Sequence, residues 1–332
     1  MHVGVVGVGA VGTRAVRQLV ASPGTTVSVY DTDHLRAKKV AEAMGPGVRV
    51  AGDVNELTGL DVVLLAQPAP HHPLALSMLV AGASVVSVSD DARDATDLLA
   101  VTAGPRTLIV GAGFSPGLSC LLARYGATRF DRVDEVHVAK HGTGGPDCAR
   151  QHHRALSGTS RSWRSGGWSE QAAGSGRELC WFPEPIGGHD CYRAESAEPA
   201  VLHAGFAGVE RITARVSATR RDRLTARLPM LRPPHAEGGL GAVRVELRGV
   251  IDGERVTEVL GVIDRAAIAA GAVAAVVAVA AGNGELPAGT FGLADPQLPT
   301  ARLLVELARR GVRAARFTGT AQGGAERASL VV

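Results

Sequence analysis

The sequence predicts an α/β protein in which a doubly wound parallel sheet is followed by an α+β domain built on a largely antiparallel sheet. Glycines at positions 7, 9 and 12 separate a short apolar run from a segment with apolar residues at helical spacing. Short strand and helix signals alternate up to about residue 113, and longer strand signals then replace them. This change of rhythm indicates two domains.

Length and composition agree with that organisation. The chain has 332 residues, of which 45% are hydrophobic and 20% charged, as is usual for globular proteins. We expect a first domain over residues 1–115 and a second over 116–285. Residues 286–332 should form a C-terminal helix and strand that return to the first domain.

The apolar segments give no sign of export or membrane insertion. Met1 leads directly into the apolar run Val3–Val8 without a basic region, so we expect no signal peptide and a cytoplasmic location. The run Ala266–Gly282 is mostly alanine and glycine. It falls short of the roughly 20 strongly apolar residues that cross a bilayer, and we interpret it as a buried helix.

Charge and cysteine patterns also restrict the function. The arginines of the stretch 211–232 are opposed only by Asp222, but no aromatic residues interleave them, so a solvated strand face is favoured over a nucleic-acid site. The cysteines show no CxxC spacing and should remain thiols. A zinc site would need Cys148, His152, His189 and Cys191, whose spacing matches no familiar pattern, so we expect no metal.

The N-terminal glycines form a complete GxGxxG motif between the strand Val3–Val8 and a helix over Thr13–Ala21. The first glycine permits a sharp turn, the second leaves room for a pyrophosphate at the helix N-terminus, and the third lets the helix pack closely. This order predicts a Rossmann domain that binds a dinucleotide. The binding turn comprises Gly7, Gly9, Ala10, Val11 and Gly12.

The next strand, Thr25–Tyr30, ends at Asp31, at the distance that the motif requires. A carboxylate there accepts hydrogen bonds from ribose hydroxyls and repels a 2′-phosphate, so NAD is favoured over NADP. Arg36, Lys38 and Lys39 follow in the next helix and could reach such a phosphate, which keeps NADP as the alternative. Asp31 could also serve only as a helix N-cap.

The alternation continues to the end of the first domain. Strands are predicted at Val48–Ala51, Val62–Ala66, Val85–Val88 and Thr107–Val110, with helices near Pro73–Ala81 and Asp94–Ala103. Ligands lie beyond the carboxyl ends of such strands. The residues expected to face the cofactor are therefore Ala66, Gln67, Pro68, Ser89 and Asp90, with His71 and His72 near the nicotinamide. For either histidine, a place at a helix N-terminus or on the surface is the alternative.

Different signals mark the second domain. A helix is predicted at Leu118–Tyr125, and strands at Val133–His141, Glu178–Phe182, Val209–Val216, Val243–Val250 and Val256–Ile263. The last two should form a hairpin through Asp252-Gly253. The aperiodic stretch Gly142–Gly176 suits a substrate loop or lid, with disorder as the alternative. The tail should contain a helix at Pro299–Arg309 and a strand at Val312–Phe317 that packs on the first domain.

With these motifs the chain resembles the saccharopine dehydrogenase-like reductases, and more distantly meso-diaminopimelate dehydrogenase. The resemblance covers most of the chain and depends on the GxGxxG motif, the segment Val85–Asp91, the turn Gly113–Leu118 and the closing Leu304–Phe317. It implies a hydride transfer between nicotinamide and the carbon of a C–N bond in an amino acid or its imine. It also implies a homodimer with contacts from the middle domain.

A second resemblance, to the sugar-type Gfo/Idh/MocA oxidoreductases, lies in Pro70–Gly82. Those enzymes carry Glu-Lys-Pro where this chain has Ser89-Asp90-Asp91, so the lysine that they use is missing. Oxidation of a simple polyol is therefore not favoured.

Hydride transfer to an imine needs a proton donor and cations that hold substrate carboxylates. Lys140 and His141 close the first strand of the second domain, where they could share these roles, and Asp90 could contact ribose or a substrate ammonium group. Alternatively, Lys140 and His141 form a pair at the end of a strand that faces water, and Asp90 caps the next helix.

Further candidates follow on a helix predicted at Asp147–Leu156. Arg150, His152, His153 and Arg154 could bind an anionic substrate, or could form a solvated basic face. Trp163, Trp168 and Trp181 could form an apolar wall of the substrate site, although core packing is the usual role of tryptophan.

These observations predict an NAD(P)-dependent oxidoreductase with a small amino-acid-like substrate. Two alternatives remain open at this point. One is a dehydrogenase of another carbonyl or alcohol compound on the same scaffold, and the other is a non-catalytic protein that binds a dinucleotide as a sensor.

Overall fold

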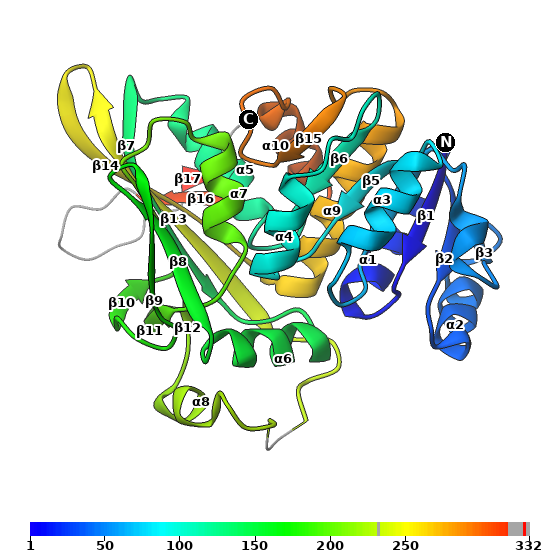
Figure 1. The fold of residues 1–332 in the computed structure, drawn as a ribbon, viewed down its shortest axis with the longest axis horizontal. Helices are drawn as coiled ribbons and strands as arrows, with labels where there is room; N and C mark the ends of the chain where they lie inside the picture. Colours follow the sequence, from blue (N-terminus) through cyan, green and yellow to red (C-terminus); the bar gives the residue numbers. More distant parts are fainter. Residues whose placement is uncertain (231–232, 318–327, 330–332) are drawn as a thin grey trace.

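A computed structural model describes residues 1–230, 233–317 and 328–329. The protein contains one sheet of seven strands and one of ten. Figure 1 shows the first sheet with its helices on the right and the second sheet on the left, with helix α9 between them. The expected α/β class with two different sheets is thus confirmed.

The seven-stranded sheet is parallel throughout. Its spatial order is β15 (Gly289–Gly292), β6 (Thr107–Val110), β5 (Ser84–Ser87), β4 (Val62–Leu65), β1 (His2–Val6), β2 (Thr26–Tyr30) and β3 (Val48–Val50). All residues of β4, β5 and β6 are buried, as expected for parallel strands covered on both faces. The predicted Rossmann sheet therefore forms, and its polar groups gather at the strand ends.

The helical segments that follow these strands or pack on them include α1 (Ala10–Val20), α2 (His34–Met44), the 3₁₀ turn η1 (Val54–Leu57), α3 (His72–Val80), α4 (Ala92–Leu99) and α9 (Ala266–Gly282). The alanine-rich α9 is buried, as predicted, and packs along α1. Glycine at position 271 permits this approach, because a Cβ there would lie 2.8 Å from the backbone nitrogen of Ala15.

The second sheet is mixed. Its main path runs β10 (Glu178–Trp181), β11 (Gly188–Arg193), β12 (Arg211–Ser217), β7 (Arg132–His141), β13 (Leu240–Ile251), β14 (Glu254–Arg265), β16 (Ala314–Phe317) and β17 (Ala328–Ser329), with β8 (Thr159–Arg164) and β9 (Gly167–Ala172) beside β12. The pair β12 and β7 is parallel and the other pairs described are antiparallel.

Helix α5 (Leu118–Ala127) covers one face of this sheet. The remaining helices of this part are α6 (Pro146–Ala155), α7 (Glu198–Gly205), α8 (Arg220–Thr225) and α10 (Thr300–Arg309). The predicted hairpin joins β13 and β14, and its turn residues Asp252 and Gly253 have φ angles of 52° and 81°. Both lie in the left-handed region that such two-residue turns require.

Two predictions of local structure need correction. The helix expected at Asp147–Leu156 forms as α6, but the rest of the stretch Gly142–Gly176 is not an irregular loop, because it contains the hairpin β8–β9. The hairpin is held by pairing with β12, a distant contact that local periodicity does not register. The arginine-rich stretch after residue 217 is not a strand face either, because Thr219 caps the short helix α8 with a capping box.

The C-terminal segment divides between the two sheets. The strand predicted at Val312–Phe317 forms as β16, but it pairs with β14 and not with the first sheet, which corrects that expectation. The unpredicted strand β15 joins the first sheet beside β6. The end of α10 also returns there, since Arg310 donates hydrogen bonds to Gln18 and Ser22.

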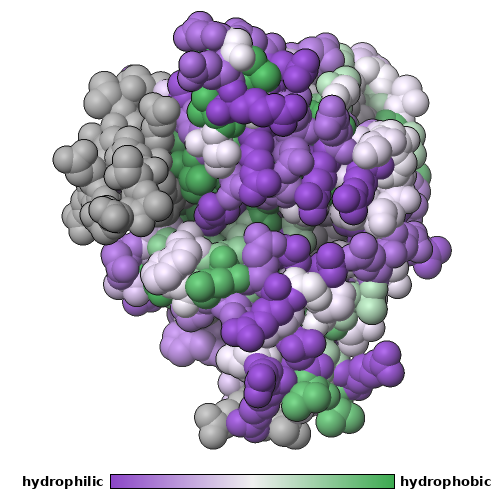
Figure 2. Space-filling model, turned by 90° about the vertical axis from the view of Figure 1, so that its left-hand side faces the viewer, coloured by the Kyte–Doolittle hydropathy of each residue, from purple (hydrophilic) through white to green (hydrophobic). Residues whose placement is uncertain are grey.

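Surface properties agree with these observations. In the part of the chain described, no helix has the length and apolar character needed to cross a membrane. Figure 2 shows that the side formed by the second sheet is mostly hydrophilic, with hydrophobic residues in small groups.

Candidate functional site

The GxGxxG turn has the geometry that its three glycines predict. Gly7 has a φ of 88°, and a Cβ there would lie 2.5 Å from the backbone nitrogen of Gln67. A Cβ at Gly12 would lie 1.9 Å from the Gly7 carbonyl oxygen, so this glycine permits the packing of α1. At Gly9 a Cβ would meet no atom within 4 Å, because this residue faces open space.

Helix α1 begins directly behind this open space. Gly9 is its N-cap and offers no side chain to cap the first turn, so backbone N–H groups of that turn remain available to a ligand. An anion beside the turn would also lie at the positive end of the helix. The geometry therefore fits the pyrophosphate of a dinucleotide.

Asp31 lies at the end of β2, beside the same turn. Its carboxylate accepts hydrogen bonds from the backbone N–H of Val8 at 2.8 Å and of Asp33 at 2.9 Å. The Arg36 guanidinium lies 3.5 Å from Asp31 Oδ2 and 3.3 Å from Asp33 Oδ2. Asp31 therefore fixes the turn, and Asp33 is the residue that caps α2.

A cleft of about 1030 Å³ opens over the turn and extends toward α6. Its size and position suit a dinucleotide. The predicted site residues that line it are Gly9, Ala10, Val11, Ala66, Gln67, Pro68, Ser89, Asp90, Arg150 and Arg154. The residues predicted from the strand ends of the parallel sheet thus lie in one cleft. Arg14, Arg17 and Arg36 also line this cleft, and the sequence analysis considered only Arg36 among them.

The loop after β4 presents Gln67 to this cleft. Gln67 Oε1 is buried and has no hydrogen-bond partner within the described residues, so a donor from a ligand would satisfy it. His71 lies beneath the loop and is fully buried, which corrects the expectation that it contacts the cofactor. Its ring nitrogens lie 2.8 Å from Ser87 Oγ and 2.7 Å from the Gln67 carbonyl oxygen, and burial lowers its pKa.

A smaller pocket of about 70 Å³ adjoins the cleft. Both cavities are lined by Val11, Val88, Asp90 and Cys148. Lys140 extends from the end of β7 into the smaller pocket, where Nζ lies 3.5 Å from Asp90 Oδ2 and 3.5 Å from the Ser115 carbonyl oxygen. The structure thus brings together two of the three predicted catalytic residues.

His141, the third, lies elsewhere. Successive side chains of a strand point to opposite faces, so the residue after Lys140 turns away from the pocket. His141 Nδ1 lies 2.9 Å from Ser217 Oγ, and its ring lies 4.3 Å from that of His189 between centroids. Burial, followed by His189, lowers its pKa. The prediction of an adjacent catalytic pair is therefore wrong.

The predicted substrate residues also separate. Arg150 and Arg154 lie on the cleft side of α6, whereas His153 bonds to the Thr225 carbonyl oxygen at 2.8 Å and anchors the segment after α8. Trp168 lies in the β8–β9 hairpin against Trp163 and His203. Neither His153 nor Trp168 lines the cleft, because helical periodicity and hairpin pairing direct them to other neighbours.

The structure reveals two groups that sequence reasoning missed. Cys148 lines both cavities, and burial together with the Asp90 carboxylate raises its pKa to about 11, so the thiol stays protonated. Glu198 lies fully buried behind the Ser115–Pro116 turn, where it accepts hydrogen bonds from Ser115 and Ser119. Burial raises the pKa of this carboxyl group. The Pro116-Gly117 turn was the only local signal for this region.

The zinc alternative finds no geometric support. Within the described ranges, no three histidine, cysteine or acidic side chains lie close enough together to hold a metal ion. The four cysteines are free, and Cys148 lies in the cleft whereas Cys191 lies in the β10–β11 hairpin beside Cys180.

Comparisons with known proteins agree with this arrangement. Residues 2–91 match the model of a family described as NADP oxidoreductase, coenzyme F420-dependent. No curated relative matches the chain at the level of sequence. Among solved structures, apo saccharopine dehydrogenase (L-Glu forming) from Saccharomyces cerevisiae is similar with a TM-score of 0.71 and 14% identity, over 96% of this chain and 100% of that chain.

DAP dehydrogenase from C. glutamicum, in complex with DAP, has a TM-score of 0.48 and 16% identity, over 93% of this chain and 98% of that chain. The expectation of a dinucleotide-dependent oxidoreductase agrees with the family that residues 2–91 match. The N-terminal part thus matches an NADP oxidoreductase family, and the chain as a whole has the fold of saccharopine dehydrogenase, as the sequence resemblance predicts.

Proposed function

We propose that this protein is an NAD(P)-dependent oxidoreductase that transfers a hydride at the carbon of a C–N bond in an amino-acid-like substrate. One observation carries the proposal. Lys140 and Asp90 form an ion pair of 3.5 Å in the small pocket, and Asp90 also lines the large dinucleotide-sized cleft. A small substrate beside Lys140 would therefore lie next to the cleft in which we place the cofactor.

The residues of the cleft fit a dinucleotide at both ends. The open space at Gly9 and the uncapped first turn of α1 suit the pyrophosphate. Gln67 Oε1, which has no hydrogen-bond partner in the described residues, can accept a hydrogen bond from the carboxamide of the nicotinamide. When bound, the nicotinamide would supply or accept the hydride. The protein's own contribution is to orient the substrate and to exclude water from the reacting atoms.

We propose NAD as the preferred cofactor. Asp31, Asp33 and Arg36 form one cluster at the ribose end, and two carboxylates with one guanidinium give it a net charge of −1. Such a cluster favours ribose hydroxyls over a 2′-phosphate. NADP is the alternative, because Arg17 lines the same cleft and Arg36 is half-exposed.

Lys140 has two roles in this proposal. Its ammonium group binds a carboxylate of the substrate and donates a hydrogen bond toward the nitrogen of the reacting C–N bond. In the direction of reduction the imine carbon gains a hydride and the nitrogen gains a proton, which yields the amine. Arg150 and Arg154, which line the adjoining cleft, would hold a second carboxylate.

Calorimetry with NADH and NADPH tests the cofactor assignment. We expect tighter binding of NADH, and a smaller preference in the Asp31→Ala variant, because loss of the carboxylate weakens NADH binding and removes the repulsion of the NADPH 2′-phosphate. Tighter binding of NADPH by the wild type would contradict the choice of NAD. Binding of neither nucleotide would contradict the assignment of the cleft.

A substrate screen then tests the reaction. Oxidation of NADH is followed with 2-keto acids in the presence of ammonium or amino acids, and reduction of NAD with amino acids. Turnover only with other carbonyl or alcohol compounds would favour a dehydrogenase of such compounds on the same scaffold. Tight cofactor binding without turnover on any of these compounds would favour a sensor.

We also propose a cytoplasmic homodimer, with contacts from the second sheet as the family resemblance implies. Sedimentation velocity of the purified protein tests the dimer, and a mass equal to that of one chain would contradict it.

A further inference from the structure

A third pocket lies on the second sheet, where β8 and β11 separate along the edge of β12. Strand β11 pairs with Arg215–Ser217, and β8 pairs with Arg211 and Ile212. Between these two ladders Thr213 and Ala214 line a cavity of about 40 Å³. That volume has room for about three water molecules or one small oxyanion.

The walls of this pocket are cationic. Arg164, Arg193, Arg211 and Arg215 line it, together with the hydroxyl groups of three serines and a threonine. Arg164 pairs directly with Arg211 across the strands, and Arg193 with Arg215, so directly opposed residues place like charges side by side. Like charges at such positions are destabilising unless another group compensates them.

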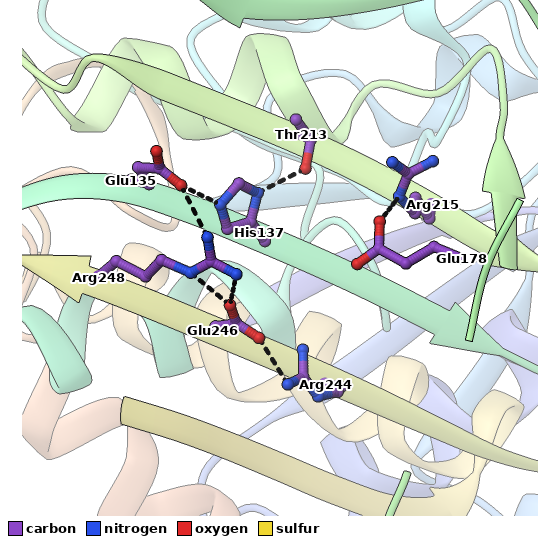
Figure 3. Close-up of polar contacts among 8 residues, drawn as sticks. All are labelled: Glu135, His137, Glu178, Thr213, Arg215, Arg244, Glu246 and Arg248. Carbon is purple, nitrogen blue, oxygen red and sulfur yellow. Dashed lines mark hydrogen bonds and ion pairs between the residues drawn. The ribbon is translucent and has the colours of Figure 1, made fainter. Parts of the chain in front are cut away.

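Carboxylates compensate these charges only in part. Figure 3 shows the Glu178 carboxylate on the Arg215 guanidinium, and the distance to Arg215 Nε is 2.7 Å. Glu135 lies opposite Arg211 in the β12–β7 pair but also contacts His137 and Arg248, and Glu246 is engaged by Arg244 and Arg248. Within the described residues, the Arg193 guanidinium donates a single hydrogen bond, of 3.3 Å, to Ser175 Oγ.

Among the described residues no salt bridge reaches Arg164, Arg193 or Arg211. Four guanidinium groups, with the carboxylates of Glu178 beside Arg215 and of Glu135 beside Arg211, leave a net charge of +2 at the pocket. Burial, with Arg215 and Arg211, lowers the pKa of Arg193, which is consistent with this crowding.

We propose that this pocket binds a small oxyanion of the phosphate class. Guanidinium groups bind phosphate and carboxylate oxygens in a bidentate manner, and the serine hydroxyls can donate to the remaining oxygens. A net charge of +2 favours a phosphate dianion over a single carboxylate. The inference does not rest on the proposed function.

The pocket is separate from the cofactor cleft. Arg215 lies beside Ala139 in the parallel pair β12–β7 and shares its face of the sheet. Lys140, the next residue, points to the opposite face and into the small pocket of the cleft. An anion bound among the arginines therefore does not compete with a dinucleotide.

Titration with inorganic phosphate tests this proposal in the full-length protein. The test variant is Arg193→Gln/Arg211→Gln. The matched control is Arg177→Gln, whose arginine is exposed directly before β10 and pairs with Asp190. We expect calorimetry to show phosphate binding to the wild type and to the control, and at least a tenfold loss of affinity in the double variant, with an unchanged affinity for NADH.

Thermal unfolding gives a second readout. Phosphate should raise the Tm of the wild type and the control, but not of the double variant, above the value in sodium chloride of equal ionic strength. In chloride alone the double variant should be as stable as the wild type or more stable, because removal of two charges relieves their repulsion.

Four outcomes would overturn the proposal. The first is a rise of Tm in chloride equal to that in phosphate, and the second is an unchanged phosphate affinity in the double variant. The third is displacement of all bound phosphate by NADH, and the fourth is tighter binding of acetate than of phosphate. A lower Tm of the double variant by the same amount in both salts would show that the arginines only support the fold. A change in its sedimenting mass would show that a second copy of the chain fills the pocket.

Discussion

The two sheets carry their polar groups in different ways. In the first sheet the strands are buried and parallel, and the groups that face the cleft follow the ends of β1, β4 and β5. In the second sheet polar side chains alternate with apolar ones along β7 and β13, so one face packs on α5 and the other carries the network of Figure 3.

This difference explains which predictions succeeded. At a strand end of a parallel sheet, a run of neighbouring residues reaches the same edge, and Ser89 and Asp90 both line the cleft. Within a strand, neighbouring residues separate, and Lys140 and His141 reach different faces. Residues adjacent in the sequence therefore share a site at the strand ends of the first sheet, whereas adjacent residues within a strand of the second sheet lie on opposite faces.

The largest expected effect concerns the turn of the first sheet. Gly12→Ala should lower the free energy of unfolding by about 3 kcal/mol or more, because its Cβ would overlap the Gly7 carbonyl oxygen. Gly9→Ala should change it by less than about 0.5 kcal/mol and weaken dinucleotide binding. Urea unfolding and calorimetry measure both quantities. Equal destabilisation by the two variants would contradict the assigned roles.

A second effect concerns His152, which bonds to the Ser217 carbonyl oxygen while its other ring nitrogen is buried without a partner in the described chain. Burial, followed by Lys140, lowers its pKa to about 4 from 6.5. As the pH falls below 6.5, the unfolded chain binds a proton that the folded protein does not.

His152 therefore costs no stability above pH 6.5 and lowers it by up to about 3 kcal/mol as the pH falls to 4. The His152→Gln variant should show a correspondingly weaker decline between these pH values when urea unfolding is followed at each pH. A decline as steep as that of the wild type would mean that other groups cause it.

The third effect tests the two faces of β7 directly. Lys140→Met should lower kcat/KM by about 100-fold, or about 2.7 kcal/mol, because the substrate loses its cation and hydrogen-bond donor. His141→Asn is the matched control and should retain activity within a factor of about three. Steady-state kinetics on the substrate found in the screen gives both values. A larger loss in His141→Asn than in Lys140→Met would reverse the assignment.

The smallest effect concerns Trp168, which the sequence placed near the substrate. Trp168→Ala should leave KM unchanged and lower the free energy of unfolding by about 1 kcal/mol, because its ring contacts with Trp163, His203 and the Arg161 guanidinium are lost. Kinetics and urea unfolding of the same variant provide the test. A raised KM at unchanged stability would place Trp168 at the substrate after all.

Several features could be predicted because their causes are local. The turn at Gly7 needs a positive φ, and the hairpin at Asp252-Gly253 needs two. The buried helix Ala266–Gly282 follows from its composition alone. By contrast, β15 is a strand only because it completes the first sheet beside β6, and its four residues carry no signal of their own.

By itself the sequence determined six strands of the first sheet, the glycine turn and the strand-end residues of the cleft, because glycine sterics and strand order act over a few residues. Only the tertiary structure decided that Lys140 faces Asp90, that Trp168 does not face the cleft, and that Arg193 and Arg211 meet in one pocket. The physical reason is that strand alternation fixes which residues share a face, whereas helices and strands distant in the chain decide what that face contacts.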